Sequence, residues 1–141
     1  MKPVLGHDEA FAAIDAIRAE LMRQGRSAVV AVADDHGELL ALLRLDGAAF
    51  SSVTVASNKA WTAARLRRPT REVLATLHAQ GTDIAFYGDP RYTGFGGGVP
   101  AFVGKTVVGA VAVSGLSDDE DEALAALGIA AMMADRSARA R

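Results

Sequence analysis

The sequence predicts an α+β fold in which one antiparallel sheet is flanked by helices. Two segments each hold a pair of apolar runs joined by a short turn, which is the pattern of a β-hairpin. Helical periodicity appears before, between and after these segments. A chain of 141 residues has the length of one domain, so we expect residues 1–141 to fold as a single unit. Two hairpins in one domain can join into one sheet whose faces the helices cover.

Helices are predicted at both ends of the chain. In residues 7–25 apolar side chains recur at helical spacing: Phe11, Ile14, Ile17 and Leu21. His7 or Asp8 can cap the start of this helix, and Gly25 suits the left-handed position just beyond its end. The last helix begins at Ser117 with the Ser-x-x-Glu pattern of a capping box and continues to the C-terminal arginines.

The first predicted hairpin has apolar runs at residues 28–33 and 39–45. The turn between them, residues 34–37, supplies the Asp and Gly residues that tight turns favour. Both runs are apolar on both faces, which predicts two central strands that are covered on each side. Arg44 interrupts the second run, and a cation in such a strand requires a partner. We therefore expect a structural ion pair with an Asp at an end of the hairpin, Asp34 or Asp46.

Two helices are predicted in the middle of the chain. The strand propensity of residues 53–55 competes there with a helical face of alanines: Ala56, Ala60, Ala63 and Ala64. We expect a helix that Ser51 or Ser52 caps and that ends before Pro69. Residues 70–81 predict a short second helix between a threonine cap and a terminal glycine.

The long segment 82–98 predicts an irregular loop with a functional or interfacial role. It contains six of the chain's glycines and prolines and four of its eight aromatic residues: Phe86, Tyr87, Tyr92 and Phe95. A long loop inside a compact domain is usually functional. The alternative is a loop whose aromatic side chains only fold back onto the core.

The stretch GGGVPAFVGKT looks like a phosphate-binding P-loop but has the wrong spacing. Five residues, instead of the required four, separate Gly98 from Gly104. A P-loop lysine also opens a helix, whereas Lys105 lies between two apolar runs, at 99–103 and 106–113. The sequence therefore predicts a second hairpin that turns at Gly104-Lys105, and no nucleotide site.

The composition excludes several classes of protein. The chain has no cysteine, so disulfides, thiolate metal sites and cysteine nucleophiles are excluded. A formal net charge of −2 gives no indication of a nucleic-acid partner. The N-terminal segment lacks the apolar region of a signal peptide and charges interrupt every apolar run, so we expect a cytoplasmic protein with no membrane partner. Half of the residues are hydrophobic and many are small, which indicates that a second subunit covers part of the surface.

Three segments resemble the GlcG/HbpS family, also called the haem-degrading or DUF336 family. They are DDHGELLALLRLDG, SNKAWTAARLRRPT and GGGVPAFVGKTVVGAVAVSGLSDDEDEALA, and the resemblance extends over nearly the whole chain. The third segment carries the family's glycine-glycine-x-proline strand start, its Val-Ser-Gly strand end and its later aspartate: Gly97, Gly98, Pro100, Val113, Ser114, Gly115 and Asp121. Relatives often have a glycine before Val-Ser-Gly, where this chain has alanine.

The resemblance implies a five-stranded antiparallel sheet and assembly into homo-oligomers, from dimers to octamers. It also implies a small-molecule binding protein, with haem or another tetrapyrrole as the candidate ligand. Other members are linked to metabolic genes, so the alternative is a small enzyme doing acid–base chemistry on a carboxylate-bearing metabolite. Fold and family do not by themselves decide between these functions.

The family places a lysine and a threonine at Lys59 and Thr62, and we expect these to line a cleft with the glycine-rich loop. The loop residues are Tyr92, Phe95, Gly96, Gly97 and Gly98. Glycines would let the backbone run close to a ligand, and the two aromatic rings would form an apolar wall. Lys59 would then hold an anionic group, and Lys59→Met should weaken binding without changing stability. The alternative is that Lys59 faces solvent.

The remaining polar residues give weaker indications. Asp121 is expected to bind backbone amides or a neighbouring chain, and Ser114 lacks the histidine that a serine nucleophile needs. The three histidines, His7, His36 and His78, form no metal-binding pattern and are weak candidates for a haem ligand. Four arginines could hold carboxylates such as haem propionates or could simply be a solvated helix end: Arg65, Arg67, Arg68 and Arg71. Catalytic residues are not identified.

Overall fold

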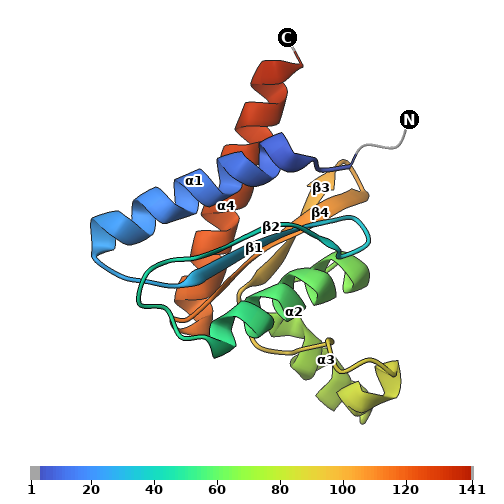
Figure 1. Cartoon of the computed structure of the whole chain (residues 1–141). Helices are drawn as coiled ribbons and strands as arrows, with labels where there is room; N and C mark the ends of the chain where they lie inside the picture. Colours follow the sequence, from blue (N-terminus) through green and yellow to red (C-terminus); the bar gives the residue numbers. More distant parts are fainter. Residues whose placement is uncertain (1–3, 141) are drawn as a thin grey trace.

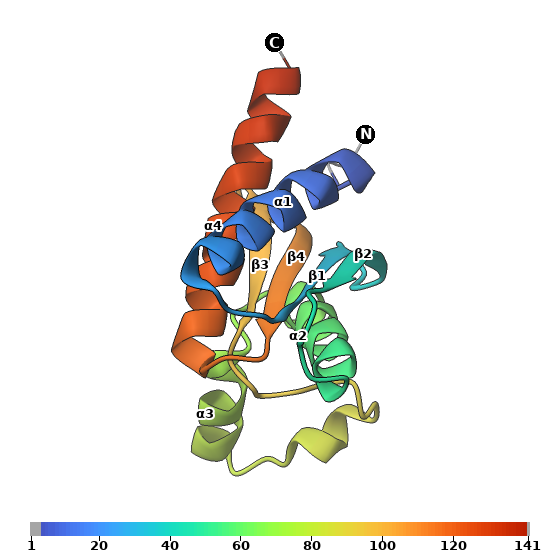
Figure 2. The ribbon, with the colours of Figure 1, turned by 60° about the vertical axis from the view of Figure 1, so that its left-hand side comes forward.

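A computed structural model describes residues 4–140 and confirms the predicted α+β class. The elements follow the predicted order: α1 (His7–Gln24), β1 (Val29–Asp34), β2 (Leu39–Arg44), α2 (Ser51–Leu66), α3 (Arg71–Gln80), the 3₁₀ turn η1 (Ile84–Tyr87), β3 (Gly98–Val103), β4 (Thr106–Ser114) and α4 (Asp118–Arg139). Helices α1 and α4 pack on one face of the sheet, and α2 packs on the other (Figure 1). Helix α3 and the segment after it extend away from the sheet, beyond α2 (Figure 2).

The sheet is antiparallel and has four strands in the order β2-β1-β4-β3. Each predicted hairpin supplies two strands, and the pairing of β1 with β4 joins them, with Val29 opposite Ser114. The expectation of five strands is wrong by one. The rest of the described chain forms helices and loops, which leaves no segment for a fifth strand.

The inner strands β1 and β4 are almost wholly buried, whereas β2 lies at a sheet edge. The prediction that both strands of the first hairpin are covered is therefore right for β1 and wrong for β2, whose leucines stay partly exposed. The ion pair expected for Arg44 is not found among residues 4–140. Its guanidinium lies over the Phe50 ring instead, 4.6 Å from the centroid, because an edge strand leaves it room to reach that ring.

The predicted second hairpin is confirmed, and its turn has the backbone that glycine favours, with φ +62° at Gly104. Lys105 is exposed and is followed by β4, so it does not open a helix as a P-loop lysine would. Near the middle of β4, Gly109 lies where a Cβ would come 2.3 Å from the Ala33 carbonyl oxygen of β1. This close approach accompanies the irregular register between β3 and β4.

Several helix ends match the predicted signals and others differ. Gly25 and Gly81 end α1 and α3 in the left-handed conformation, and Ser117 begins α4 with a capping box. Gly6, rather than His7 or Asp8, occupies the N-cap of α1, and neither predicted serine caps α2 through its side chain. Within residues 4–140, none of the helices is long and apolar enough to cross a membrane.

Candidate functional site

The ammonium group of Lys59 lies inside the protein, where it joins three elements. From α2, its Nζ donates a hydrogen bond to the Val113 carbonyl oxygen of β4 at 2.9 Å. It also lies 3.2 Å from Oδ2 of Asp121, near the start of α4. Both side chains are almost fully buried, with 3% and 2% of their surfaces exposed. The alternative that Lys59 faces solvent is therefore wrong.

The carboxylate of Asp121 holds both Lys59 and the backbone before α4. Its Oδ1 accepts a hydrogen bond from the Leu116 amide at 3.1 Å, which confirms the expected role of Asp121 in binding backbone amides. Burial raises the pKa of Asp121 above its ordinary value, while the positive charge of Lys59 acts in the opposite direction. Each charge is thus kept out of water next to the one group that compensates it. The sequence missed this pair, because its members lie 62 residues apart.

The glycine-rich loop is packed directly against the Lys59–Asp121 pair. Gly97 has φ +125°, and a Cβ there would lie 2.6 Å from the Val113 carbonyl oxygen and 2.9 Å from Lys59 Nζ. A Cβ at Gly98 would lie 2.6 Å from the Lys59 carbonyl oxygen. The amide of Gly96 donates to the Asp118 carboxylate at 3.0 Å. The glycines let the backbone of the loop pack closely, as predicted, but here it packs against residues of the protein itself and not against a ligand.

Thr62 fixes the start of the same loop on α2. Its buried hydroxyl donates to the Arg91 carbonyl oxygen and accepts from the Thr93 amide, both at 3.1 Å. Between these two anchors, the Tyr92 ring packs edge-on against Trp61 with the ring centroids 4.4 Å apart. Phe95, in the same loop, is 60% exposed.

A recess of about 310 Å³ opens beside this loop, at the end of α2 and the first hairpin turn. The residues around it are Asp35, His36, Ala64, Arg65, Arg67, Tyr92 and Val107. Of the residues predicted for the site, Tyr92 lines this recess. Three weaker candidates, one histidine and two arginines, come together here from separate segments. The sequence did not predict that these three residues lie together, since only the fold brings the 34–37 turn to the end of α2.

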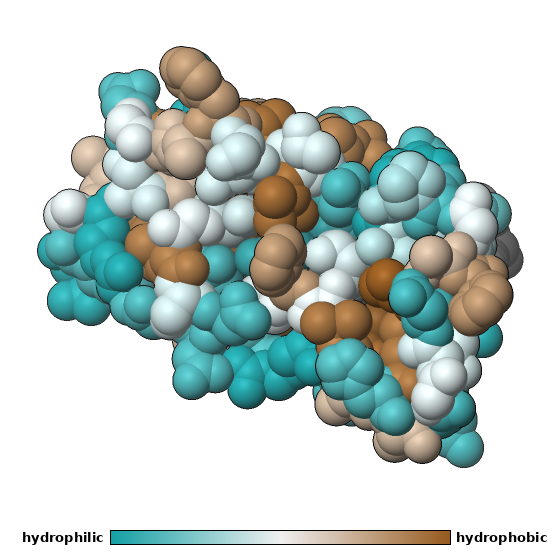
Figure 3. Space-filling model, turned by 90° about the horizontal axis from the view of Figure 1, so that it is seen from below, coloured by the Kyte–Doolittle hydropathy of each residue, from teal (hydrophilic) through white to brown (hydrophobic). Residues whose placement is uncertain are grey.

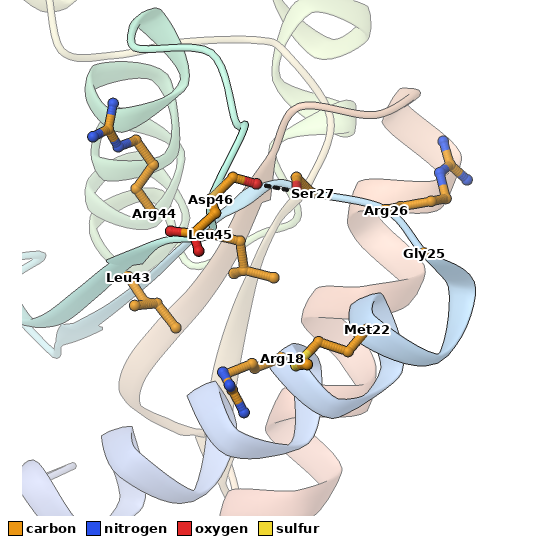
Figure 4. Close-up of a pocket in the computed structure, with 9 residues that line it drawn as sticks. All are labelled: Arg18, Met22, Gly25, Arg26, Ser27, Leu43, Arg44, Leu45 and Asp46. Carbon is orange, nitrogen blue, oxygen red and sulfur yellow. Dashed lines mark hydrogen bonds between the residues drawn. The ribbon is translucent and has the colours of Figure 1, made fainter.

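A second hollow, of about 450 Å³, lies between α1 and β2 (Figure 4). Leu43 of β2 and Leu45, just after the strand, point toward α1, where Met22 and Arg18 lie, while Arg44 points to the opposite side of the strand. On the face that α2, α3 and residues 82–97 form, apolar side chains lie in separate groups surrounded by polar ones (Figure 3).

Comparison with known proteins decides the family. Residues 5–130 match the family described as "Haem degrading protein HbpS-like". The chain belongs to the HbpS-like family. Protein GlcG of Escherichia coli strain K12 is 39% identical to it over 113 residues, which cover 80% of this chain and 83% of GlcG.

Solved structures agree with membership of the HbpS-like family. Protein ORFY of Klebsiella pneumoniae is 28% identical and superimposes with a TM-score of 0.86, covering 95% of this chain and 94% of that one. HbpS of Streptomyces reticuli, solved as a double mutant, is 31% identical with a TM-score of 0.83, covering 92% and 88%. The family resemblance in the sequence is thereby confirmed.

Proposed function

We propose that this HbpS-like protein binds an anionic small molecule, with haem or another tetrapyrrole as the candidate ligand. The observation that carries the proposal is the recess in which His36, Arg65 and Arg67 meet beside the Tyr92 ring. A tetrapyrrole of the haem type carries carboxylates on a flat apolar ring, which suits guanidinium groups beside an aromatic wall. The family's description, which names haem, supports the same ligand class.

We propose that three of the predicted site residues, Thr62, Gly97 and Gly98, stabilise the loop that carries Tyr92 into the recess. Thr62 fixes the loop on either side of Tyr92, and Gly97 and Gly98 seat the loop's end on the Lys59–Asp121 pair. A direct contact of Phe95 with the ligand stays a prediction. The alternative of an acid–base enzyme gains no support from Lys59 and Asp121, because a substrate would have to displace packed backbone to reach them.

Titration with ferric haem tests the proposed function. We expect a saturable change of the Soret absorption that ends at one haem or fewer per chain. The same titration with heat-unfolded protein controls for adsorption of haem to exposed apolar side chains. A signal that rises linearly without saturation, or that equals the unfolded control, would contradict the proposal.

We also propose that the protein assembles into at least a dimer through the β2 edge. An edge strand presents unpaired backbone groups, and β2 adds partly exposed leucines to them, with Leu39 48% exposed. We expect light scattering at micromolar concentration to give a mass of two or more chains, and Leu39→Lys to shift the mass toward the monomer. Leu127→Lys on α4, at a residue 38% exposed, is the matched control. A monomeric mass for the unmodified chain would rule out this assembly.

A further inference from the structure

Residues 71–87, which we call the strap, pack only lightly on the rest of the protein. They comprise α3 and η1 and extend away from the sheet, beyond α2 (Figure 2). Helix α3 makes few close contacts with any other helix or strand. Of the side chains in the strap, only Val73 and Leu77 are buried, and neither belongs to the apolar clusters of the sheet and its covering helices. A segment with few buried apolar contacts opens at a lower free energy than the whole fold.

The packing beneath the strap is incomplete. Val73 and Leu77 border a small void of about 50 Å³, together with Leu66 of α2 and Tyr87 at the end of η1. A hollow of about 590 Å³ also opens between α3 and the start of η1. Side chains that line a void lose part of the dispersion energy that close packing provides. Apolar contacts therefore hold the strap only weakly.

Buried hydrogen bonds fix the chain on either side of the strap. The Thr70 amide donates to the Gly98 carbonyl oxygen at 3.0 Å, and the Gly98 amide donates to the Thr70 hydroxyl at 2.9 Å. Beyond the other end, the Thr62 hydroxyl holds the following loop on α2. Gly88, with φ +81°, lies directly after the strap, where a glycine can absorb a change of backbone direction. The strap can thus move while the chain before and after it stays in place.

Arg71, the first residue of the strap, ties it to the start of α4. Its Nε lies 2.9 Å from Oε1 of Glu122, and its Nη2 donates to the Asp119 carboxylate. The side chains of Arg71 and Asp119 are 40% and 85% exposed, so water and salt compete with their ion pair. An exposed ion pair contributes little to stability, which makes this a contact that can open and form again.

The other end of the strap touches the aromatic side chains beside the recess. The Tyr87 ring lies against the Tyr92 ring with the centroids 4.8 Å apart, and Tyr92 in turn packs on Trp61. Tyr87 is 45% exposed, whereas Trp61 is 4% exposed. If the strap moves, one side of the Tyr92 ring is therefore uncovered while Trp61 stays buried on α2.

We infer that the strap is a flap that opens as one unit between Thr70 and Gly88, and that the ion pairs of Arg71 hold it closed. Opening uncovers the two buried side chains of the strap and the Tyr92 ring. It leaves the sheet and its covering helices folded. The wall of the recess thus has a closed and an open form, and the contact of Arg71 with α4 determines how much of each is present.

Thiol labelling tests the opening directly, because the chain has no cysteine of its own. Val73→Cys places a thiol beneath the strap, and the matched control Val30→Cys places one in the central strand β1, at positions that are 2% and 0% exposed. We expect iodoacetamide to label Val73→Cys at least tenfold faster than Val30→Cys under native conditions, since strap opening exposes only the first thiol. Equal labelling rates would show that both thiols require unfolding of the whole protein and would rule out the flap.

Hydrogen exchange of the unmodified chain gives a measurement that depends on no substitution. The hydrogen-bonded amides of α3 should have protection factors at least tenfold lower than those of β1. Arg71→Gln, which removes both ion pairs with α4, should lower the protection of the strap about threefold further and leave β1 unchanged. The matched control is Arg26→Gln, which breaks a pair with Glu120 in the same acidic turn of α4 but holds a different segment. It should leave the strap unchanged.

Two exchange results would overturn the flap. Equal protection of α3 and β1 in the unmodified chain would show that the strap opens only when the whole protein unfolds. An equal loss of protection throughout the chain in Arg71→Gln would show that Arg71 stabilises the fold as a whole and does not hold the strap closed.

Discussion

Replacing Lys59 by Met is expected to lower the free energy of unfolding by about 3–5 kcal/mol, because it leaves the Asp121 carboxylate buried without its compensating charge. This reverses the expectation from the sequence, in which Lys59 served a ligand and its loss left stability unchanged. The ammonium also holds the Val113 carbonyl oxygen, which would lose its side-chain donor. Urea denaturation at one fixed protein concentration measures the change, since assembly would otherwise contribute to it.

A double substitution shows whether the cost comes from the unpaired charge. In Lys59→Met/Asp121→Asn both charges are gone, and the amide oxygen of Asn can still accept from Leu116. The double variant should therefore be more stable than the sum of the two single effects predicts, by at least about 1 kcal/mol. Arg23→Met, which breaks an exposed pair with Glu20, should have only a small effect. Additive single effects would show that Lys59 and Asp121 act independently.

The pH dependence of the Lys59→Met variant gives a second readout. Burial raises the pKa of Asp121 in the folded state, and removal of Lys59 takes away the charge that lowers it. A group whose folded pKa exceeds its unfolded value contributes stability below the unfolded pKa and loses it as the pH rises through the folded pKa. The deficit relative to wild type should thus be smallest below about pH 4, the ordinary range of an aspartate, and grow above it. A deficit that does not change with pH would contradict this origin.

Local patterns in the sequence were sufficient to predict the elements. The capping box at Ser117, the glycines that end two helices and the two turns all act over a few residues, so they can be recognised without knowledge of the fold. Propensity alone would have made residues 53–55 a strand. The alanine face of α2 decided for a helix, because small side chains let the helix pack closely on the sheet.

The arrangement of the candidate site could be predicted only in part. The family pattern indicated Lys59, Thr62 and the glycines, and the structure brings these together around one loop. The pattern did not show that Asp121 would take up the charge of Lys59, since that requires α4 to cross the end of β4. Likewise, the edge position of β2 depends on which strands pair. A run of residues that is apolar on both faces gives no information about that pairing.

Replacing Gly97 by Ala is expected to destabilise the protein by about 3 kcal/mol or more. Two causes combine at this position. The backbone has φ +125°, which a residue with a side chain adopts only with strain. The added methyl group would also lie 2.6 Å from the Val113 carbonyl oxygen and 2.8 Å from Cβ of Asp121. Neither neighbour can move easily, because one belongs to a central strand and the other to the buried ion pair.

Gly88→Ala is the matched control for this substitution. Gly88 lies in the same loop with φ +81°, but nothing lies within 4 Å of the place that an added methyl group would take, so the variant has the backbone strain without the collision. We expect it to cost about 1 kcal/mol. The difference between the two unfolding free energies therefore contains the collision with Val113 and Asp121 together with the larger backbone strain at φ +125°. If Gly97→Ala costs no more than Gly88→Ala, the loop does not rest on the ion pair, and the support that we propose for the Tyr92 wall of the recess is lost.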